Sequence, residues 1–233
     1  MSESDRHESE IVRSWRANAH AWTRAVREGR IPSRVAGTDR AILDGVLRNG
    51  PGRVLDAGCG EGWLARALPT EGWEVVGIDA SEELIARARE LGGGTFSALA
   101  FEDIIAVPKA AGGPYEVIVL NFALLGERVA PLLAALASRL CPEGRLIVQT
   151  VHPWSAVGDA PYRDGWRVET FDAFGGEFPA PMPWFFRTME GWLVEIAKAG
   201  LVVERLEEPL DQDTGRPLSL MLTLSRGPRA SRP

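Results

Sequence analysis

The stretch that decides the fold of this chain is Val54-Leu55-Asp56-Ala57-Gly58-Cys59-Gly60-Glu61-Gly62. Its apolar first half predicts a short strand, and its alternating glycines predict a tight turn. A glycine has no Cβ, so its backbone can approach a ligand closely and adopt a positive φ without strain. From Trp63 onward, apolar residues recur at helical spacing. The stretch therefore predicts the strand, turn and helix with which open α/β sheets hold nucleotide-like ligands at the carboxyl ends of their strands.

The spacing of the glycines restricts the class of ligand that the turn could bind. They follow the pattern Gly-x-Gly-x-Gly, whereas a dinucleotide fingerprint needs its third glycine one place later, where Trp63 stands. No Gly-Lys-Ser/Thr follows, which excludes a P-loop. The carboxylate of Asp56 would repel a pyrophosphate group and would suit a ligand that carries an ammonium or sulfonium group. An ordinary tight turn in a parallel-sheet protein is the alternative interpretation.

Length and composition fit one sizeable globular α/β domain. The chain has 233 residues, of which 45% are hydrophobic and 25% charged. Residues 1–10 are polar and acidic, unlike a signal peptide, and no apolar run approaches about 18 residues, so we expect no membrane span. Cys59 and Cys141 are too few for a disulfide framework and indicate free thiols in a reducing, cytoplasmic setting. The net charge of -6 weighs against a nucleic-acid partner, because phosphate binding needs a basic surface.

Strand and helix patterns alternate along most of the chain. Helices are expected over residues 10–28 and 39–47, before the first strand. The expected strands cover residues 53–57, 74–78, 95–101, 115–120, 145–151, 201–206 and 218–224. This order predicts an α/β fold with a doubly wound, mainly parallel seven-stranded sheet and an antiparallel C-terminal edge strand. We expect residues 1–50 to form an N-terminal helical cap and residues 51–233 to form the main domain.

Residues 152–187 interrupt this alternation with prolines, glycines and aromatic side chains. A loop of this length inside a compact domain is usually functional. Its aromatic residues either form a lid that lines a ligand pocket or pack as a small separate core that fastens the segment to the sheet. The residues expected to line such a pocket are Trp154, Tyr162, Trp166, Trp184 and Phe185.

Four ordered motifs resemble those of the class I S-adenosylmethionine-dependent methyltransferases. Residues 54–62 resemble the first motif, and residues 75–81 resemble the second, in which an acid closes the second strand. Residues 115–121 resemble the motif of strand four, and residues 140–146 the entry to strand five. The chain also resembles uncharacterised bacterial proteins of this class. The resemblance implies an enzyme with a Rossmann-like fold whose cofactor is S-adenosylmethionine, and the main domain would be its methyltransferase domain.

The resemblance also implies where the cofactor would bind. Gly58 and Gly60 would let the backbone pass the methionine part of the cofactor, and Asp56 would meet its ammonium group. Asp79 would accept hydrogen bonds from both ribose hydroxyls, which needs a bidentate acceptor at a strand end. The alternative role of Asp79 is a helix cap ahead of Ser81. The residues assigned to the cofactor are Asp56, Gly58, Cys59, Gly60, Asp79, Ala80, Phe101, Asn121 and Phe122.

One position departs from the family pattern. Ala100 stands where the family often has an acidic residue that binds the adenine amino group. Phe101 could cover the adenine face, and Glu102 or Asp103 could replace the missing acceptor. A core position for Phe101, with both acids on the surface, is an equally open interpretation.

Methyl transfer from a sulfonium is an in-line displacement, so much of the catalysis comes from holding the nucleophile in line with the methyl group. A general base is needed only for an acceptor that is protonated at the working pH. His152 is the candidate catalytic base, because it follows the fifth strand at the rim where the acceptor should sit. The alternative is that His152 caps the strand and hydrogen-bonds locally. No metal site is expected.

The aromatic segment favours a small, flat or apolar molecule as the methyl acceptor. The alternatives are a protein or nucleic-acid methyltransferase and a non-catalytic S-adenosylmethionine-binding protein. The acidic net charge weighs against nucleic acid. The sequence from Asn121 to Leu124 also lacks the Asn/Asp-Pro-Pro-Tyr/Phe signature of enzymes that methylate base amino groups. We expect the chain to act as a monomer or a homodimer.

Overall fold

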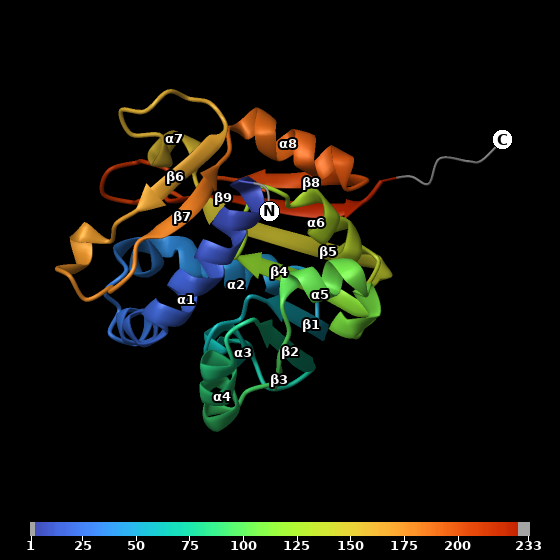
Figure 1. Cartoon of the computed structure of the whole chain (residues 1–233). Coiled ribbons are helices and arrows are strands. Elements are labelled where there is room, and N and C mark those ends of the chain that lie inside the picture. Colours follow the sequence, from blue (N-terminus) through green and yellow to red (C-terminus); the bar gives the residue numbers. More distant parts are fainter. Residues whose placement is uncertain (1–2, 228–233) are drawn as a thin grey trace.

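The computed structural model describes residues 3–227. Seven strands form one sheet in the spatial order β3-β2-β1-β4-β5-β9-β8. Neighbours from β3 to β5 run parallel, whereas β9 is antiparallel to both β5 and β8 (Figure 1). The strands are Gly52–Ala57 (β1), Trp73–Asp79 (β2), Thr95–Ala98 (β3), Tyr115–Asn121 (β4), Leu140–Val151 (β5), Leu201–Glu207 (β8) and Ser219–Arg226 (β9). The expected fold class is confirmed, and the antiparallel strand β9 lies next to the edge strand β8.

Helices cover both faces of the sheet, as a doubly wound fold requires. One face carries α2 (Asp39–Leu47), α3 (Trp63–Ala67) and α4 (Glu82–Leu91), and the other carries α5 (Phe101–Ala106), α6 (Ala130–Ala137) and α8 (Met189–Lys198). A π-helical turn, η1 (Arg34–Thr38), precedes α2, and a 3-10 turn, η2 (Pro108–Ala111), precedes β4. Within residues 3–227, no helix is long and apolar enough to cross a membrane.

The central strand β4 shows why the sheet is easy to find in the sequence. Val117 and Val119 pack against the helices of one face, and Ile118 and Leu120 pack against those of the other. All four side chains are fully buried. A strand with helices on both sides reads as a continuous apolar run, without the alternation of a half-exposed strand.

The expectation of a long loop over residues 152–187 is wrong. The segment forms a short helix, α7 (Pro153–Ala156), and a two-stranded antiparallel hairpin of β6 (Gly165–Glu169) and β7 (Met182–Phe186), with a 3-10 turn, η3 (Asp172–Phe174), between them. Pro183 lies inside β7, and proline removes a backbone donor and is therefore a poor indicator of a strand. The hairpin is a separate sheet, in which β6 and β7 form backbone pairs only with each other.

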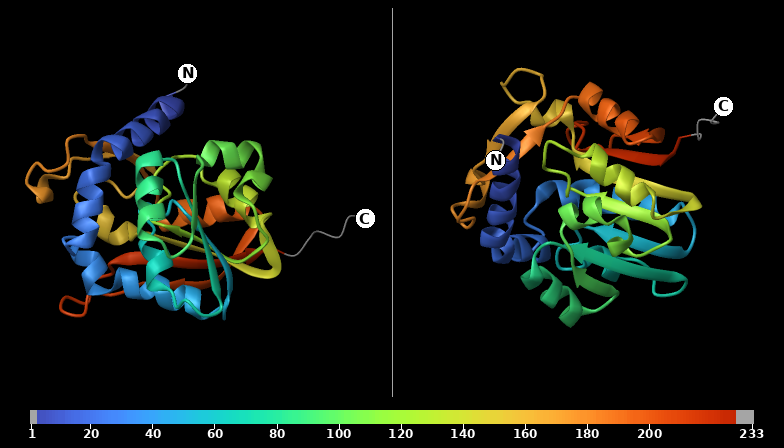
Figure 2. Two further views of the ribbon diagram at one scale, coloured as in Figure 1. Left: turned by 90° about the horizontal axis from the view of Figure 1, so that it is seen from below. Right: turned by 45° about the vertical axis from the view of Figure 1, so that its right-hand side comes forward.

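The first helix, α1 (Glu3–Arg27), lies alongside the hairpin (Figure 2). It begins at residue 3, earlier than the expected start at residue 10. The Trp22 ring packs against two phenylalanine rings. Its centroid lies 5.6 Å from that of Phe171 and 4.9 Å from that of Phe178. The side chain of Asn18 donates to the carbonyl of Ala180 at 2.7 Å. α1 and the hairpin therefore form one covering layer, joined by its own small core.

The third strand is shorter than expected. β3 ends at Ala98, and Phe101 is the first residue of α5 instead of the last residue of a strand. Ala100 has an extended backbone, and its N–H lies 3.4 Å from Oδ2 of Asp103. An acidic residue that reaches back to the N-terminus of a helix is a typical start signal, and it competes here with the strand pattern.

Candidate functional site

The glycine turn after β1 has no room for a side chain at two of its three glycines. Gly58, Gly60 and Gly62 all have positive φ, at 83°, 55° and 76°. A Cβ at Gly58 would lie 2.6 Å from that of Ala123, and one at Gly62 would lie 2.7 Å from the ring of Phe96. A Cβ at Gly60 would meet nothing within 4 Å. Two of the glycines are therefore required by packing, and the third presents open backbone to the cleft.

Asp79 joins this turn to the next strand. At the end of β2, its carboxylate accepts hydrogen bonds from the N–H of Gly60 at 3.0 Å and from that of Ser81 at 2.8 Å. The cap of α4 is Ser81, whose Oγ accepts from the N–H of Leu84 at 3.3 Å. Burial raises the pKa of Asp79, and the two backbone donors oppose that rise. Asp79 is thus held in a fixed orientation with lone pairs left for further donors.

A groove of about 570 Å³ opens beside Asp79. It is bounded by the ends of β2 and β3, by the start of α4 and by one residue of α1. The residues that line it are Arg16, Ala80, Ser81, Glu82, Glu83, Ala98, Leu99, Ala100 and Asp103. Phe101 follows this wall and is partly buried; its ring reaches to 3.6 Å of the place where a Cβ of Gly58 would lie. Phe101 therefore touches both the core and the glycine turn.

Asp56 is the most strongly perturbed acid of the site. Its side chain is 2% exposed, and its pKa is raised to about 7 by burial and by the nearby charge of Asp79, with Arg34 acting in the opposite direction. Cys59, in the same turn, is also buried, and burial raises the pKa of its thiol. A buried carboxylate of this kind is at lower free energy when a cation lies beside it.

Arg34 is a residue that the motifs did not reveal. It lies in η1, and its guanidinium stacks 4.5 Å from the centre of the Trp63 ring, directly after the glycine turn. Its Nε donates to Oδ1 of Asp39 at 2.8 Å. Its charge acts on Asp56, so the site holds a fixed cation and a fixed anion close together. An arginine 24 residues before Gly58 carries no recognisable spacing signal.

At the end of β4, the side-chain amide of Gln149 orients that of Asn121. Nε2 of Gln149 donates to the carbonyl of Thr38 at 3.0 Å and to Oδ1 of Asn121 at 2.9 Å. Because a backbone carbonyl can only accept, Gln149 presents its NH₂ group here, and Asn121 must present its oxygen to it. The NH₂ group of Asn121 is thereby turned away from Gln149. The next residue, Phe122, has a φ of 53°, which is uncommon for a bulky residue and typical of functional sites.

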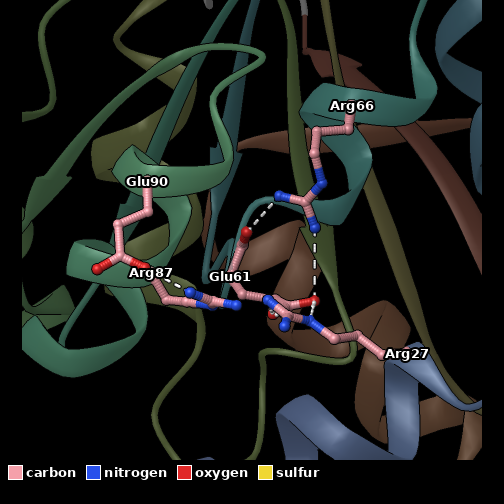
Figure 3. A network of polar contacts seen from close by, with 5 residues as sticks. All are labelled: Arg27, Glu61, Arg66, Arg87 and Glu90. Carbon is pink, nitrogen blue, oxygen red and sulfur yellow. Dashed lines mark hydrogen bonds and ion pairs between the residues drawn. The ribbon is translucent and has the colours of Figure 1, made fainter.

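Glu61, in the middle of the glycine turn, is held by two arginines (Figure 3). Its side chain is 6% exposed. Arg27, in the last turn of α1, donates to Oε2 from Nε at 2.8 Å and from Nη2 at 2.5 Å. Arg66 of α3 donates to the carbonyl of Glu61 at 2.6 Å and lies 3.4 Å from its carboxylate. A separate pair on α4, Arg87 with Glu90, lies beside this group (Figure 3).

Two of the five aromatic residues expected to line a pocket lie together against α1. Trp166 and Phe185 face each other across the hairpin, with ring centroids 5.4 Å apart. Trp166 also stacks on His7 of α1 at 4.2 Å. The N–H of Phe185 donates to the carbonyl of Leu125 at 2.8 Å. This face of the hairpin is therefore tied to the loop that follows β4.

The other three aromatic residues lie elsewhere. Trp184 and Tyr162 both contact Phe186, at 6.0 and 5.9 Å between ring centroids. Trp184 and Phe186 belong to the face of the hairpin opposite Phe185, because neighbouring residues in a strand point to opposite sides. Tyr162 precedes β6 and packs on that same face through Phe186. The Tyr162 hydroxyl accepts from the N–H of Met189 at 3.0 Å. Trp154 is 71% exposed. The structure thus does not gather all five into one group.

His152 is 5% exposed and uses both ring nitrogens. Nδ1 accepts from the N–H of Trp154 at 3.2 Å, and Nε2 lies 2.7 Å from Oε1 of Glu208. With Nδ1 as acceptor, the proton of a neutral ring sits on Nε2 and is donated to Glu208. His152 is the cap residue of α7. These are the contacts expected of the alternative role, a locally bonded cap, and the choice between cap and base is tested below.

Two arginines of the insert hold backbone carbonyls. Arg167 donates to the carbonyls of Ala156 and Val157 at 2.8 and 3.1 Å. Arg187, 3% exposed, donates from Nη2 to the carbonyls of Gly126, at 2.7 Å, and of its neighbour Glu127. Burial lowers the pKa of both guanidinium groups. Both side chains therefore fasten the insert to its surroundings.

This strand order, with a glycine turn after β1 and an acid closing β2, defines a class I S-adenosylmethionine-dependent methyltransferase. The sequence of residues 34–204 matches the family described as methyltransferase domain. Because this match covers more than half of the chain, the chain belongs to that family. A curated relative, the ubiquinone biosynthesis O-methyltransferase of Xylella fastidiosa, is 39% identical over 108 residues, which are 43% of this chain and 42% of the relative. The chain spans less than two thirds of the length of the curated relatives it matches first.

Solved structures share the fold. An S-adenosylmethionine-dependent methyltransferase from Mesorhizobium loti matches 80% of this chain and 96% of its own, with a TM-score of 0.60 and 24% identity. The 1,6-didemethyltoxoflavin-N1-methyltransferase of Burkholderia thailandensis, solved with 1,6-didemethyltoxoflavin and S-adenosylhomocysteine bound, matches 98% of this chain and 92% of its own, with a TM-score of 0.62 and 16% identity. The family match confirms the expectation of a methyltransferase enzyme, and these structures confirm the expected fold.

The raised pKa of Asp56 predicts how Asp56→Asn changes stability with pH. The pKa of about 7 in the folded protein lies above the ordinary carboxyl value, so ionising Asp56 opposes folding. Below about pH 3.9, the pKa of an aspartate in the unfolded chain, Asp56 is neutral in both the folded and the unfolded state. The stability that the neutral carboxyl contributes to the folded state is lost as the pH rises from there through about 7, the pKa in the folded protein. We expect the melting temperature of ligand-free D56N to exceed that of the wild type by more at pH 7.5 than at pH 5.

Thermal unfolding at several pH values measures this difference. Asp44→Asn is the control, because Asp44 forms an exposed pair with Arg40 on α2, and D44N should show no such trend. A D56N melting temperature at or below that of the wild type at pH 7.5 would contradict the burial of an uncompensated carboxylate.

Proposed function

We propose that this enzyme transfers the methyl group to a small molecule bound beneath α1 and the β6–β7 hairpin. The observation that carries the proposal is the fixed cover over the end of β4. Phe185 of the hairpin bonds to Leu125 of the loop after β4, and Trp166 of the hairpin stacks on His7 of α1. A cover bonded on two sides limits the size of the ligand that fits under it, which favours a small acceptor over a polymer.

Two similar proteins support this choice by what their names say of them. The Burkholderia thailandensis methyltransferase, aligned over nearly the whole chain including α1 and the hairpin, has 1,6-didemethyltoxoflavin bound. The Xylella fastidiosa relative is a ubiquinone biosynthesis O-methyltransferase. One name specifies a nitrogen and the other an oxygen, so the proposal is limited to a small-molecule acceptor and leaves the accepting atom open.

The residues around the glycine turn fit S-adenosylmethionine. When bound, this cofactor supplies an electrophilic methyl group on a sulfonium. We assign Asp79 to the ribose hydroxyls, because its carboxylate stands at the end of β2 in a fixed orientation. We assign Asp56 to the ammonium group, since a cation there would relieve the burial of its charge. We assign Arg34 to the carboxylate of the methionine part, which places a zwitterion between an anion and a cation.

The remaining cofactor residues have supporting positions. Gly58 and Gly60 present backbone, and Ala80 lines the groove that would take the nucleoside. Phe101 is assigned to the adenine face because its ring reaches the glycine turn. The oriented amide of Asn121, with Phe122 beside it, ends β4 under the place where cofactor and acceptor would meet. These side chains bind and orient the ligands, and proximity is the main source of rate.

The direct test of the proposal is turnover. Release of S-adenosylhomocysteine is measured with purified protein, S-adenosylmethionine and two panels: small aromatic or quinone-like acceptors with hydroxyl or ring nitrogen groups, and polymers (peptides, RNA and DNA). We expect turnover with at least one small molecule and background release with the polymers. Turnover confined to a polymer would overturn the small-molecule assignment.

The assignment of Arg34 is tested by truncating the ligand instead of the protein. Arg34→Met should weaken binding of S-adenosylhomocysteine by about tenfold or more, since a charged hydrogen bond contributes about 1.5–3 kcal/mol. It should leave binding of 5′-methylthioadenosine, which lacks the whole amino-acid part, unchanged. Isothermal titration with both ligands gives the comparison. Equal losses for the two ligands would show that Arg34 acts on the fold of the site and not on the carboxylate.

The role of His152 is tested once an acceptor is in hand. His152→Ala removes the cap of α7 and the bond to Glu208. We expect a lower melting temperature, with the cap alone worth about 1 kcal/mol, and kcat within a few-fold of the wild type. Loss of kcat by a factor of about 100 or more, with cofactor affinity unchanged, is the result that a general base would give.

A further inference from the structure

We propose that Arg27 is a positioning residue for the cofactor, and that its ion pair with Glu61 couples the covering layer to the glycine turn. The covering layer is α1 together with the β6–β7 hairpin. The inference goes beyond the proposed function, because it concerns the coupling between the covering layer and the cofactor site and does not depend on which molecule accepts the methyl group.

The first step is the burial of a charge inside the glycine turn. Glu61 stands between two glycines with left-handed backbone, and its side chain is 6% exposed. An ionised carboxylate that is nearly buried needs charged partners, and removing one partner leaves an uncompensated charge. Arg66 reaches mainly the backbone carbonyl of Glu61. The close contacts to the carboxylate come from Arg27, through both Nε and Nη2 (Figure 3).

The second step connects Glu61 to Asp79, the residue assigned to the ribose hydroxyls. Gly60, which precedes Glu61, donates its N–H to Asp79 at 3.0 Å. The turn is closed on the other side by the N–H of Gly62, which donates to the carbonyl of Cys59 at 3.0 Å. A displacement of Glu61 therefore moves Gly60 and removes one of the two backbone donors that orient Asp79. Arg27 acts on the cofactor through this backbone and without touching it.

The third step is the attachment of α1 to the insert. Two residues of α1 and one just past it bond to the segment that leads into β7. Asn18 bonds to Ala180 at 2.7 Å, and Arg24 and Arg30 pair with Glu177 at 3.2 and 2.8 Å. Trp22 adds the aromatic contacts described above. α1 is thus fastened to the hairpin along its length and to the glycine turn at its last turn.

Together these contacts form a continuous connection from the hairpin to the cofactor. Coupling between two sites is reciprocal in free energy. If the cover holds the glycine turn in its binding conformation, then cofactor binding must in turn stabilise the cover. Cofactor binding thereby favours the arrangement of α1 and the hairpin that covers the acceptor site.

The alternative is that the ion pair stabilises the folded chain and has no effect on ligand binding. The two can be separated by measuring affinity and melting temperature on the same variants. Arg13→Ala is the matched control, because Arg13 lies on the same helix and pairs with Glu10 of that helix instead of with Glu61 or the insert.

Isothermal titration with S-adenosylhomocysteine is the first measurement, on the wild type and on Arg27→Ala, Arg27→Lys and Arg13→Ala. We expect R27A to bind at least tenfold more weakly, R27K to recover part of the loss, and R13A to remain within threefold of the wild type. Wild-type affinity in R27A, with or without a lower melting temperature, overturns the proposal. If the wild type itself does not bind S-adenosylhomocysteine, the cofactor site is overturned instead. Failure of the coupling and failure of the cofactor assignment therefore give different results.

Hydrogen exchange gives the second measurement and serves if R27A folds poorly, since Glu61→Gln and R27K are milder changes. In the wild type, adding S-adenosylhomocysteine should slow amide exchange in α1 and over residues 165–186. In R27K and E61Q this protection should be reduced at ligand concentrations that saturate the site. Equal protection in all three proteins overturns the coupling.

Discussion

The cofactor site depends on one steric constraint, the absence of space for a Cβ at Gly58 where β1 ends. The N–H groups of Gly58 and Cys59 both donate to the carbonyl of Ile78, at 2.7 and 3.0 Å. The same turn lies against Ala123, which leaves no room for a Cβ at Gly58. The chain can therefore cross from β1 to α3 along this path only with a glycine at position 58. That crossing brings the turn against the ends of β2 and β4, and so places the acid of β2 beside it.

The charged and polar groups of the site accordingly come from two kinds of element. The strand ends supply groups whose positions are fixed by the sheet, namely Asp56, Asp79 and Asn121. The segments before β1 supply groups that reach the same place from outside the sheet, namely Arg34 from η1 and Arg27 from α1. The first set explains why a nucleoside with a cationic amino-acid end suits this sheet. The second set explains how elements that cover the site can respond to it.

The sequence predicted the sheet well, because helices on both faces make each central strand a continuous apolar run, as in β4. It failed at the hairpin, where Pro183 obscures the strand pattern of β7, and at Phe101, which begins a helix. In the site, residues within a local motif could be predicted, such as Asp56 and Asp79. Partners joined over a long separation, such as Arg27 with Glu61 or Gln149 with Thr38, could not, because no local spacing records a contact made by tertiary folding.

The most direct test of the central claim is a crystal structure of the protein with S-adenosylhomocysteine bound. The ribose hydroxyls should lie on the carboxylate of Asp79, with the homocysteine part along the backbone of the glycine turn and its ammonium group at Asp56. The sulfur should face α1 and the β6–β7 hairpin. A nucleoside bound away from Asp79, or a sulfur directed away from the hairpin, would contradict both the cofactor assignment of these residues and the proposed place of the methyl acceptor.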